Sequence, residues 1–150
     1  MLVNQCMTKS VEVISPNMTI QEAATKMKDG DFGILPVGEN DRLVGMITDR
    51  DIAIRGIASG CGPSTPIREI MSKEVLYCYE DQDIKEVARN MGDNQLRRLP
   101  VLSRQKRLVG ILSLGDVALR KKKESKVAAA EALCQISEHA HREPHTPTYV

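Results

Sequence analysis

The sequence has few aromatic residues and no histidine before position 139. It contains no Trp, one Phe and three Tyr among its 150 residues. So few rings do not provide the row of stacked aromatics typical of proteins that bind single-stranded nucleic acid. The histidines His139, His141 and His145 lie together near the C-terminus, which excludes a His-based catalytic triad further upstream. We expect no metal site among them, because this polar segment lacks the fixed framework that ligands need.

Paired cysteines and long apolar runs are also missing. The four cysteines, Cys6, Cys61, Cys78 and Cys134, form no C-x-x-C motif, so neither a zinc knuckle nor a redox pair is indicated and free thiols are expected. No apolar run approaches the roughly 20 residues needed to span a bilayer. The start, MLVNQCMTKS, lacks the apolar core of a signal peptide. We therefore expect a cytoplasmic protein without a membrane partner.

Net charge does not indicate a polyanionic partner. Lys and Arg number 21 against 20 Asp and Glu, and so balanced a total does not favour nucleic acid or an anionic membrane. The basic run 121–123 is better explained as a solvated helix face than as a nucleic-acid contact. Nucleic acid is therefore not an expected partner.

What the sequence does contain is an internal repeat, one unit present in two copies. Residues 7–37 are echoed by residues 71–101 at a constant offset, 84 − 20 = 64 for Ile20 and Ile84. After one inserted residue the offset becomes 116 − 51 = 65, which pairs Asp51 with Asp116. Two copies imply two similar units packed around a pseudo-twofold axis. Because a unit of about 55–60 residues is marginal for a core of its own, we expect the two copies to share one core.

Each copy predicts the element order β-α-β-β-α, a mixed α/β fold. A short strand is expected at 10–14 and 74–79, from β-branched and aromatic residues. Capping-box spacing at 19–22 and 83–86 starts a helix, whose apolar positions recur at i, i+3, i+4 and i+7. Two apolar strands and a second helix follow. They are expected at 34–37, 43–47 and from Thr48 in the first copy, and at 99–102, 108–112 and from Ser113 in the second.

These patterns divide the chain into a first repeat at 7–60, a Gly- and Pro-rich linker at 61–70, a second repeat at 71–126 and a C-terminal segment at 127–150. The last helix of the second repeat is expected to run on through residues 120–123. Residues 127–136 continue a helical pattern, which either covers a partner subunit or docks loosely. After Glu138 the polar, Pro-containing sequence predicts a flexible tail.

The candidate binding motifs of the sequence are two segments, Gly45–Asp51 and Gly110–Asp116. Both have the form G-h-h-[ST]-x-x-D, where h is apolar, at a junction from strand to helix. A hydroxyl three residues before a carboxylate closes a helix start, and for the motif alone capping is the favoured interpretation. The same junction also suits a nucleotide. The carboxylate can accept two hydrogen bonds from a cis-diol, and the hydroxyl can donate to phosphate beside the helix N-terminus.

Both copies carry x-x-h-P-V before a turn and then L-V-G-h-h-[ST]-x-x-D, and this order resembles a CBS-domain pair, or Bateman module. The resemblance covers about residues 7–120. It implies a regulatory module that binds AMP, ADP, ATP or S-adenosylmethionine in clefts between the copies. It also implies no catalytic residue, no metal and no required cofactor.

The resemblance further implies that each cleft takes its ribose-binding Asp from one copy and part of its base pocket from the other. The Asp116 cleft would be lined by Ser113, Ile111 and Arg98, and by Thr8, Val11, Val13, Phe32 and Gly33. The Asp51 cleft would be lined by Thr48, Met46 and Ile34, by Ser72, Val75, Tyr77, Leu96 and Arg97, and by Arg50.

The two copies differ where charge matters. Arg98 stands where the first copy has Ile34, and Arg50 stands where the second copy has Gly115. A guanidinium can bind phosphate through two parallel hydrogen bonds, whereas an isoleucine cannot. The Asp116 cleft is therefore predicted to be the better phosphate site. For Arg50 and Arg97 a solvated surface charge is an equal alternative.

The favoured hypothesis is a non-catalytic sensor that signals in trans to an unidentified protein partner. Four repeats of a homodimer would form a disc, and the ligand would favour one arrangement of repeats or subunits. A nucleotide-processing enzyme using Thr48, Asp49 and Asp51 is the second hypothesis. It lacks a Walker lysine loop and an H-x-E motif. A nucleic-acid-binding or structural module is the third.

Overall fold

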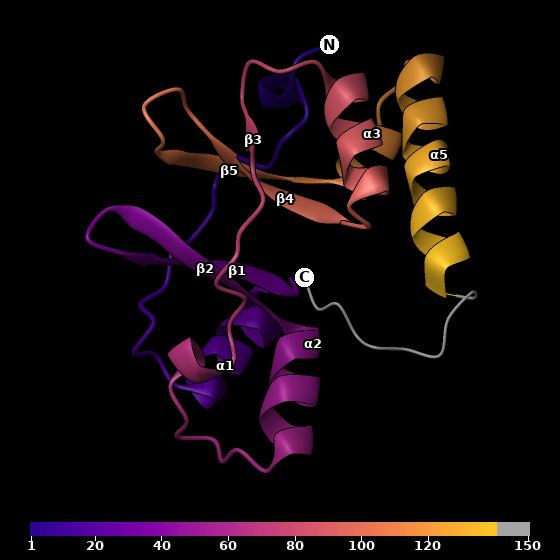
Figure 1. Ribbon diagram of the computed structural model, residues 1–150. Coiled ribbons are helices and arrows are strands. Elements are labelled where there is room, and N and C mark those ends of the chain that lie inside the picture. The colour runs from indigo at the N-terminus through magenta and orange to yellow at the C-terminus, as the bar shows by residue number, and fades with distance from the viewer. Residues whose placement is uncertain (141–150) are drawn as a thin grey trace. The chain divides into compact units, whose positions relative to one another are not determined.

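The described residues, 1–140, form two compact units in the computed structural model (Figure 1). Of the described residues, unit 1 contains Met1–Val11 and 76–140, and unit 2 contains Glu12–Val75. The boundaries fall inside the two sequence repeats, because the first residues of each repeat pack with the other repeat's unit. The mixed α/β class is confirmed. Within 1–140, no helix is both long and apolar enough to cross a membrane.

Unit 2 is a two-stranded antiparallel sheet with helices. Helix α1 (Ile20–Gly30) begins with a capping box, in which Glu22 N donates to Thr19 Oγ1 at 3.1 Å and Thr19 N donates to Glu22 Oε2 at 3.0 Å. Strands β1 (Ile34–Glu39) and β2 (Arg42–Thr48) follow and pair with each other. Helix α2 (Asp49–Asp51) continues as a π-helical segment, Ile52–Gly56. The predicted order of helix, two strands and helix is therefore present here.

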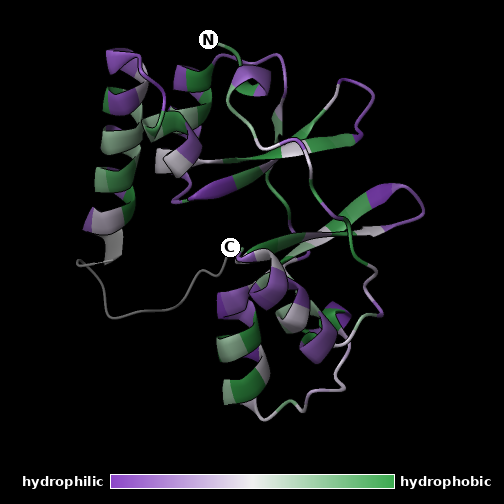
Figure 2. Cartoon of the chain, turned by 180° about the vertical axis from the view of Figure 1, so that it is seen from behind, coloured by the Kyte–Doolittle hydropathy of each residue, from purple (hydrophilic) through white to green (hydrophobic). Residues whose placement is uncertain are grey.

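Unit 1 repeats this plan on a three-stranded sheet. Its elements are β3 (Cys78–Tyr79), α3 (Ile84–Asp93), β4 (Arg98–Leu102), β5 (Leu108–Ser113), α4 (Leu114–Ala118) and α5 (Lys123–Ala140). The sheet order is β3-β4-β5, with β3 parallel to β4 and β4 antiparallel to β5. The strands are mostly apolar, whereas the turns that join the hairpin strands are hydrophilic (Figure 2).

The first strand of each copy is much shorter than the sequence predicts. Only Cys78 and Tyr79 form a strand in the second copy, and Ile14 makes a single bridge to Val37 in the first. Val13 and Leu76 are each 49% exposed. The chain passes from one compact unit to the other at these points. An extended propensity gives a strand only where a sheet edge is available to pair with it, so the predictions of 10–14 and 74–79 are wrong in extent.

The last helix of the second repeat does not run on through residues 120–123, as expected. Helix α4 ends at Ala118, and α5 begins only at Lys123. The break lets α5 turn back and pack on α3 and α4, where Ala129 and Ala132 become buried. The helical prediction for 127–136 is confirmed, and residues 141–150 of the expected flexible tail lie outside the described part of the chain.

Each unit has its own hydrophobic core, so the prediction of one shared core is wrong. The core of unit 2 is centred on Leu35, Ile47 and Ile67. The core of unit 1 includes Leu112 and takes in Val3 from the N-terminus and Ala132 from α5. Segments from outside the repeat therefore enlarge unit 1 beyond the roughly 55–60 residues for which an independent core is marginal.

In each unit the strand that leads into the G-h-h-[ST]-x-x-D motif, β2 or β5, is here called the motif strand. A glycine in this strand lets an incoming segment, which contains Ser72 or Thr8, approach closely. Thr8 exchanges both backbone hydrogen bonds with Ile111 of β5, at 2.9 and 3.0 Å. Ser72 does the same with Met46 of β2, at 2.9 and 3.0 Å. A Cβ at Gly110 would lie 2.6 Å from the Thr8 carbonyl oxygen. The glycine of L-V-G is required because the incoming backbone occupies the space that a side chain would need.

The Asp83→Ala variant should lose stability at neutral pH but not in acid. Asp83 caps α3 by accepting a hydrogen bond from Lys85 N at 2.9 Å, and that bond, helped by the nearby N-terminal ammonium, lowers the pKa of its carboxyl. Losing such a cap costs about 1 kcal/mol of unfolding free energy. Because the folded-state pKa is the lower one, the stabilisation is full at neutral pH and disappears as the pH falls below about 4.

Chemical unfolding followed by circular dichroism at neutral and acidic pH measures this change. Thr19→Ala is the matched control, because it removes a neutral cap from α1 and its cost should not depend on pH. An equal penalty for Asp83→Ala at both pH values would contradict the prediction.

The Gly110→Ala variant should destabilise unit 1 by about 1–3 kcal/mol, the usual cost of forcing extra atoms into a packed site. The added methyl would displace the Thr8 backbone from β5. Gly115→Ala in α4 is the control, because the nearest atom to its new Cβ is 3.5 Å away and alanine favours a helix. Urea unfolding of both variants provides the comparison, and equal stability would refute the close-approach argument.

Candidate functional site

The first motif places Thr48 and Asp51 where β2 becomes α2. Asp51 N donates to Thr48 Oγ1 at 3.1 Å, and Thr48 N donates to Asp51 Oδ2 at 2.9 Å. These two bonds form a capping box, as the interpretation of the motif alone predicts. Asp51 is only 2% exposed. Its other oxygen, Oδ1, lies 3.8 Å from Arg55 Nε, so both oxygens have partners.

The second motif has the same geometry but a more accessible carboxylate. Asp116 N donates to Ser113 Oγ at 3.0 Å, and Ser113 N donates to Asp116 Oδ2 at 2.8 Å. Asp116 is only partly buried. Within residues 1–140 its Oδ1 has neither a hydrogen bond nor an ion pair. Capping therefore uses one oxygen of Asp116 and leaves the other without a partner in this part of the chain.

The incoming segments bring a hydroxyl residue beside each motif strand. Thr8 pairs with Ile111 in unit 1, and Ser72 pairs with Met46 in unit 2. Thr8 is exposed, whereas Ser72 Oγ is buried and has no hydrogen-bond partner among the described residues. The structure thus brings Thr8 into the unit of Asp116 and Ser72 into the unit of Asp51. Val11 and Val75 lie in the same two units, respectively.

Cross-strand register places Arg98 and Ile34, the equivalent residues that differ in charge between the copies, beside the motif hydroxyls. Arg98 is the register partner of Ser113, and Ile34 is the register partner of Thr48. Directly opposed residues in an antiparallel pair have Cβ atoms roughly 4.5–5.5 Å apart. Arg98 is exposed, so its guanidinium is accessible next to the start of α4. The equivalent place in unit 2 has no charge at residue 34.

Backbone contacts hold the residues just before these strands. Asp49 N donates to Gly33 O at 2.9 Å, and Leu114 N donates to Arg97 O at 3.0 Å. The two bonds are equivalent in the two copies. They tie the residue just before β1 or β4 to the start of the helix that follows the hairpin, α2 or α4. The side chains of Arg50 and Arg97 are exposed.

The remaining candidate residues lie in one unit, whereas the Asp whose cleft they were expected to line lies in the other. Val13, Phe32 and Gly33 lie in unit 2, whereas Asp116 lies in unit 1. Tyr77, Leu96 and Arg97 lie in unit 1, whereas Asp51 lies in unit 2. Phe32 and Tyr77 are 38% and 41% exposed. Leu96 differs from them, because it is 4% exposed and belongs to the core of unit 1.

The motif search missed an arginine four residues after each Asp. Arg55 Nη1 donates to Ile70 O at 3.3 Å, and Arg120 Nη2 donates to Cys6 O at 2.8 Å. Each carbonyl lies two residues before the hydroxyl residue, Ser72 or Thr8, that pairs with the motif strand. The spacing D-x-x-x-R, present in both copies, is the sequence signal that would have identified these arginines.

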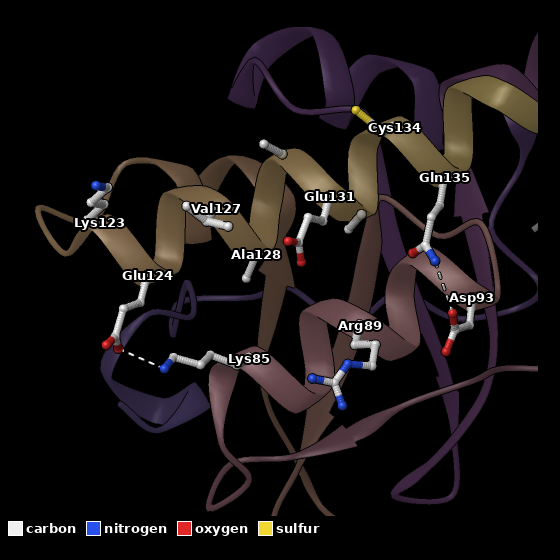
Figure 3. Close-up of a pocket in the computed structure, with 12 residues that line it drawn as sticks. Lys85, Arg89, Asp93, Lys123, Glu124, Val127, Ala128, Glu131, Cys134 and Gln135 are labelled. Carbon is white, nitrogen blue, oxygen red and sulfur yellow. Dashed lines mark hydrogen bonds and ion pairs between the residues drawn. The ribbon is translucent and has the colours of Figure 1, made fainter.

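A groove of about 940 Å³ lies elsewhere in unit 1, between α3 and α5 (Figure 3). An ion pair of 2.7 Å between Lys85 and Glu124 spans one end, and Gln135 donates to Asp93 at 3.3 Å at the other. None of the motif residues lines it. Its walls carry basic side chains (Lys85, Arg89 and Lys123) and as many acidic ones (Asp93, Glu124 and Glu131), so the groove does not concentrate charge of one sign for a ligand.

Burial makes the thiol of Cys78, which lies in the sheet of unit 1, an unsuitable nucleophile. Cys78 in β3 is 3% exposed, and burial raises its pKa to about 12. A thiol with that pKa stays protonated at neutral pH, whereas the thiolate is the reactive form. Around the motif, the groups available are a carboxylate, a hydroxyl and a guanidinium, which suit a diol and a phosphate.

The chain is similar to known proteins over both sequence repeats. A family model of the CBS domain matches residues 3–55 and 67–122. The CBS domain-containing protein YhcV of Bacillus subtilis is 43% identical over 135 residues, which cover 90% of this chain and 94% of YhcV. Inosine-5'-monophosphate dehydrogenase of Methanocaldococcus jannaschii is 33% identical over 120 residues, but these make up 23% of that enzyme.

A solved structure shows the same fold with ligands. The crystal structure of the CBS domain pair of protein MJ0100 in complex with 5'-methylthioadenosine and S-adenosyl-L-methionine is similar with a TM-score of 0.71 and 30% identity. The match covers 79% of this chain and 93% of that one. From its two matched repeats and its fold, this chain belongs to the CBS-domain family and is a CBS-domain pair.

Proposed function

We propose that the protein is a non-catalytic regulatory module that binds an adenosine-containing ligand at Asp116. The observation that carries the proposal is that Oδ1 of the partly exposed Asp116 has no partner among residues 1–140, while its Oδ2 accepts a hydrogen bond from Ser113 N at 2.8 Å. A carboxylate held at a defined angle with one open oxygen suits a ribose cis-diol, because ionised acceptors form the stronger hydrogen bonds.

The neighbours of Asp116 favour a phosphorylated ligand. Ser113 caps the N-terminus of α4, and exposed Arg98 lies opposite it in the sheet. A guanidinium beside a hydroxyl can bind a phosphate or another anionic group through several charge-assisted hydrogen bonds. AMP, ADP or ATP is therefore proposed ahead of S-adenosylmethionine. The ligands of the similar MJ0100 domain pair support the adenosyl part.

The base pocket is proposed to combine residues of both sequence repeats. Ile111 would line it from the repeat of Asp116, and Thr8, Val11, Val13, Phe32 and Gly33 would line it from the first repeat. The exposure of Phe32 and Val13 supports this assignment, since an apolar side chain left in solvent is available to pack on an adenine ring. A second, weaker cleft headed by Asp51 would follow the same plan. Thr48, Met46, Ile34, Ser72, Val75, Tyr77, Arg97 and Arg50 would line it.

The output is proposed to act in trans. A ligand favours the arrangement of repeats or subunits that binds it more tightly, and that preference can be transmitted to a second copy or to another protein. A cytoplasmic homodimer is the proposed assembly.

The Asp116→Asn variant should weaken binding of AMP or ATP by about 1–3 kcal/mol, because it replaces charge-assisted hydrogen bonds to the ribose. The amide oxygen can still cap α4, so the fold should survive. Isothermal titration calorimetry measures the change. Asp29→Asn is the control, since this Asp is 70% exposed on α1. Unchanged affinity of a folded Asp116→Asn protein would remove Asp116 from the site.

The Arg98→Met variant should discriminate between ligands. We expect AMP to lose about 1.5–3 kcal/mol of binding free energy, the usual worth of a hydrogen bond to a charged group, while adenosine and 5'-methylthioadenosine lose little. Arg89→Met, which removes an exposed arginine on α3, is the control. Equal losses for charged and uncharged ligands would contradict a phosphate contact at Arg98.

A further inference from the structure

The arginines Arg55 and Arg120 occupy equivalent positions, 120 − 55 = 65, the offset that relates the two motif aspartates. Each donates from its guanidinium to the backbone carbonyl that precedes the incoming segment, Ile70 O or Cys6 O. The carbonyls are equivalent as well, 70 − 6 = 64. This shared bond fixes both arginines close to their motifs.

The two arginines differ in what their Nε contacts. Arg55 Nε lies 3.8 Å from Asp51 Oδ1. Arg120 Nε is buried without a hydrogen-bond partner in the described part of the chain, and no basic group there lies within 4.0 Å of Asp116. The difference follows the burial of the carboxylates, since Asp51 is 2% exposed and Asp116 is only partly buried.

We propose that these arginines determine which aspartate is open to a ligand: Arg55 engages Asp51 and closes it, whereas Arg120 is held on the Cys6 carbonyl and leaves Asp116 open. The proposal goes beyond the proposed function, and rests on it for the identity of the ligand. It makes Arg55 a specificity-determining residue, which acts on the ligand through Asp51. One strong site per chain is the consequence.

The physical reason is competition for the same oxygen. A diol can reach Asp51 Oδ1 only by displacing Arg55 or by sharing the carboxylate with it. Removing a partner from a buried ion pair leaves an uncompensated charge, which is strongly unfavourable. The same diol at Asp116 would displace only solvent. Two motifs of the same form, G-h-h-[ST]-x-x-D, can therefore differ in affinity although both keep their capping boxes.

Carboxylate labelling tests the proposal without any ligand. Full-length protein is treated with a water-soluble carbodiimide and an amine, and the modified residues are quantified by peptide mass spectrometry. Asp51 should be modified at least about tenfold more slowly than Asp116, because reaction of a buried, paired group requires local opening. In urea the two rates should become equal. Similar rates in the folded protein would overturn the proposal.

Arg55→Met and Arg120→Met form a matched pair of variants. Both remove the bond to the preceding carbonyl, but only Arg55→Met removes a partner from a motif carboxylate. Labelling of Asp51 should rise about tenfold in Arg55→Met, as its opening no longer breaks an ion pair, and labelling of Asp116 should be unchanged in Arg120→Met. A rise at both sites, or at neither, counts against the proposal. If Arg55→Met does not fold, the wild-type comparison still decides.

Calorimetry with AMP then connects the arginine to function. The wild type should bind one AMP per chain, and Arg55→Met should add a second, weaker event. Failure of the wild type to bind any adenosyl ligand would refute the proposed function and leave the labelling result standing. Two equal wild-type sites per chain would refute the role of Arg55 and leave the proposed function standing.

Discussion

Two pairs of backbone hydrogen bonds, Thr8 with Ile111 and Ser72 with Met46, are the constraint on which the rest of this structure depends. Each pair ties a motif strand to a segment that precedes the other repeat's first helix. The glycine of each L-V-G admits that backbone because a Cβ would collide with it. Neither repeat is therefore complete alone, since each motif strand needs a neighbour supplied from outside its own repeat.

The same constraint positions the chemistry. Once the incoming segment lies beside the strand, the hydroxyl residue, the motif and the following arginine share one small region. The arginine donates to the segment's carbonyl, which fixes the end of the helix that carries the aspartate. Capping and ligand binding are then compatible, because the capping box needs only one oxygen of each carboxylate. In the described part of unit 1 the second oxygen has no partner, and in unit 2 it lies 3.8 Å from Arg55 Nε.

Much of the fold was predictable because it rests on local patterns. Capping residues and the 3.6-residue period identified α1 and α3, and short apolar runs identified the two hairpins. The errors occurred where the secondary structure of a segment depends on another part of the chain that packs against it. Residues 10–14 and 74–79 have strand propensity but mostly lack a sheet edge. The break between α4 and α5 follows from docking of α5 on α3 and α4, which the basic run 120–123 does not reveal.

By itself the sequence determined the doubled architecture, the helix caps and the pairing of Thr48 with Asp51 and of Ser113 with Asp116, since these depend on residues within a few positions of one another. It also identified Arg98 against Ile34 as a difference in charge. Only the tertiary structure decided how open each carboxylate is, because burial and ion pairing depend on groups brought together by packing. Arg55 and Arg120 have the same spacing from their aspartates, but Arg55 Nε lies near Asp51 whereas Arg120 Nε has no hydrogen-bond partner in the described part of the chain. Such a contact is set by side-chain direction and surrounding packing, which spacing along the chain does not encode.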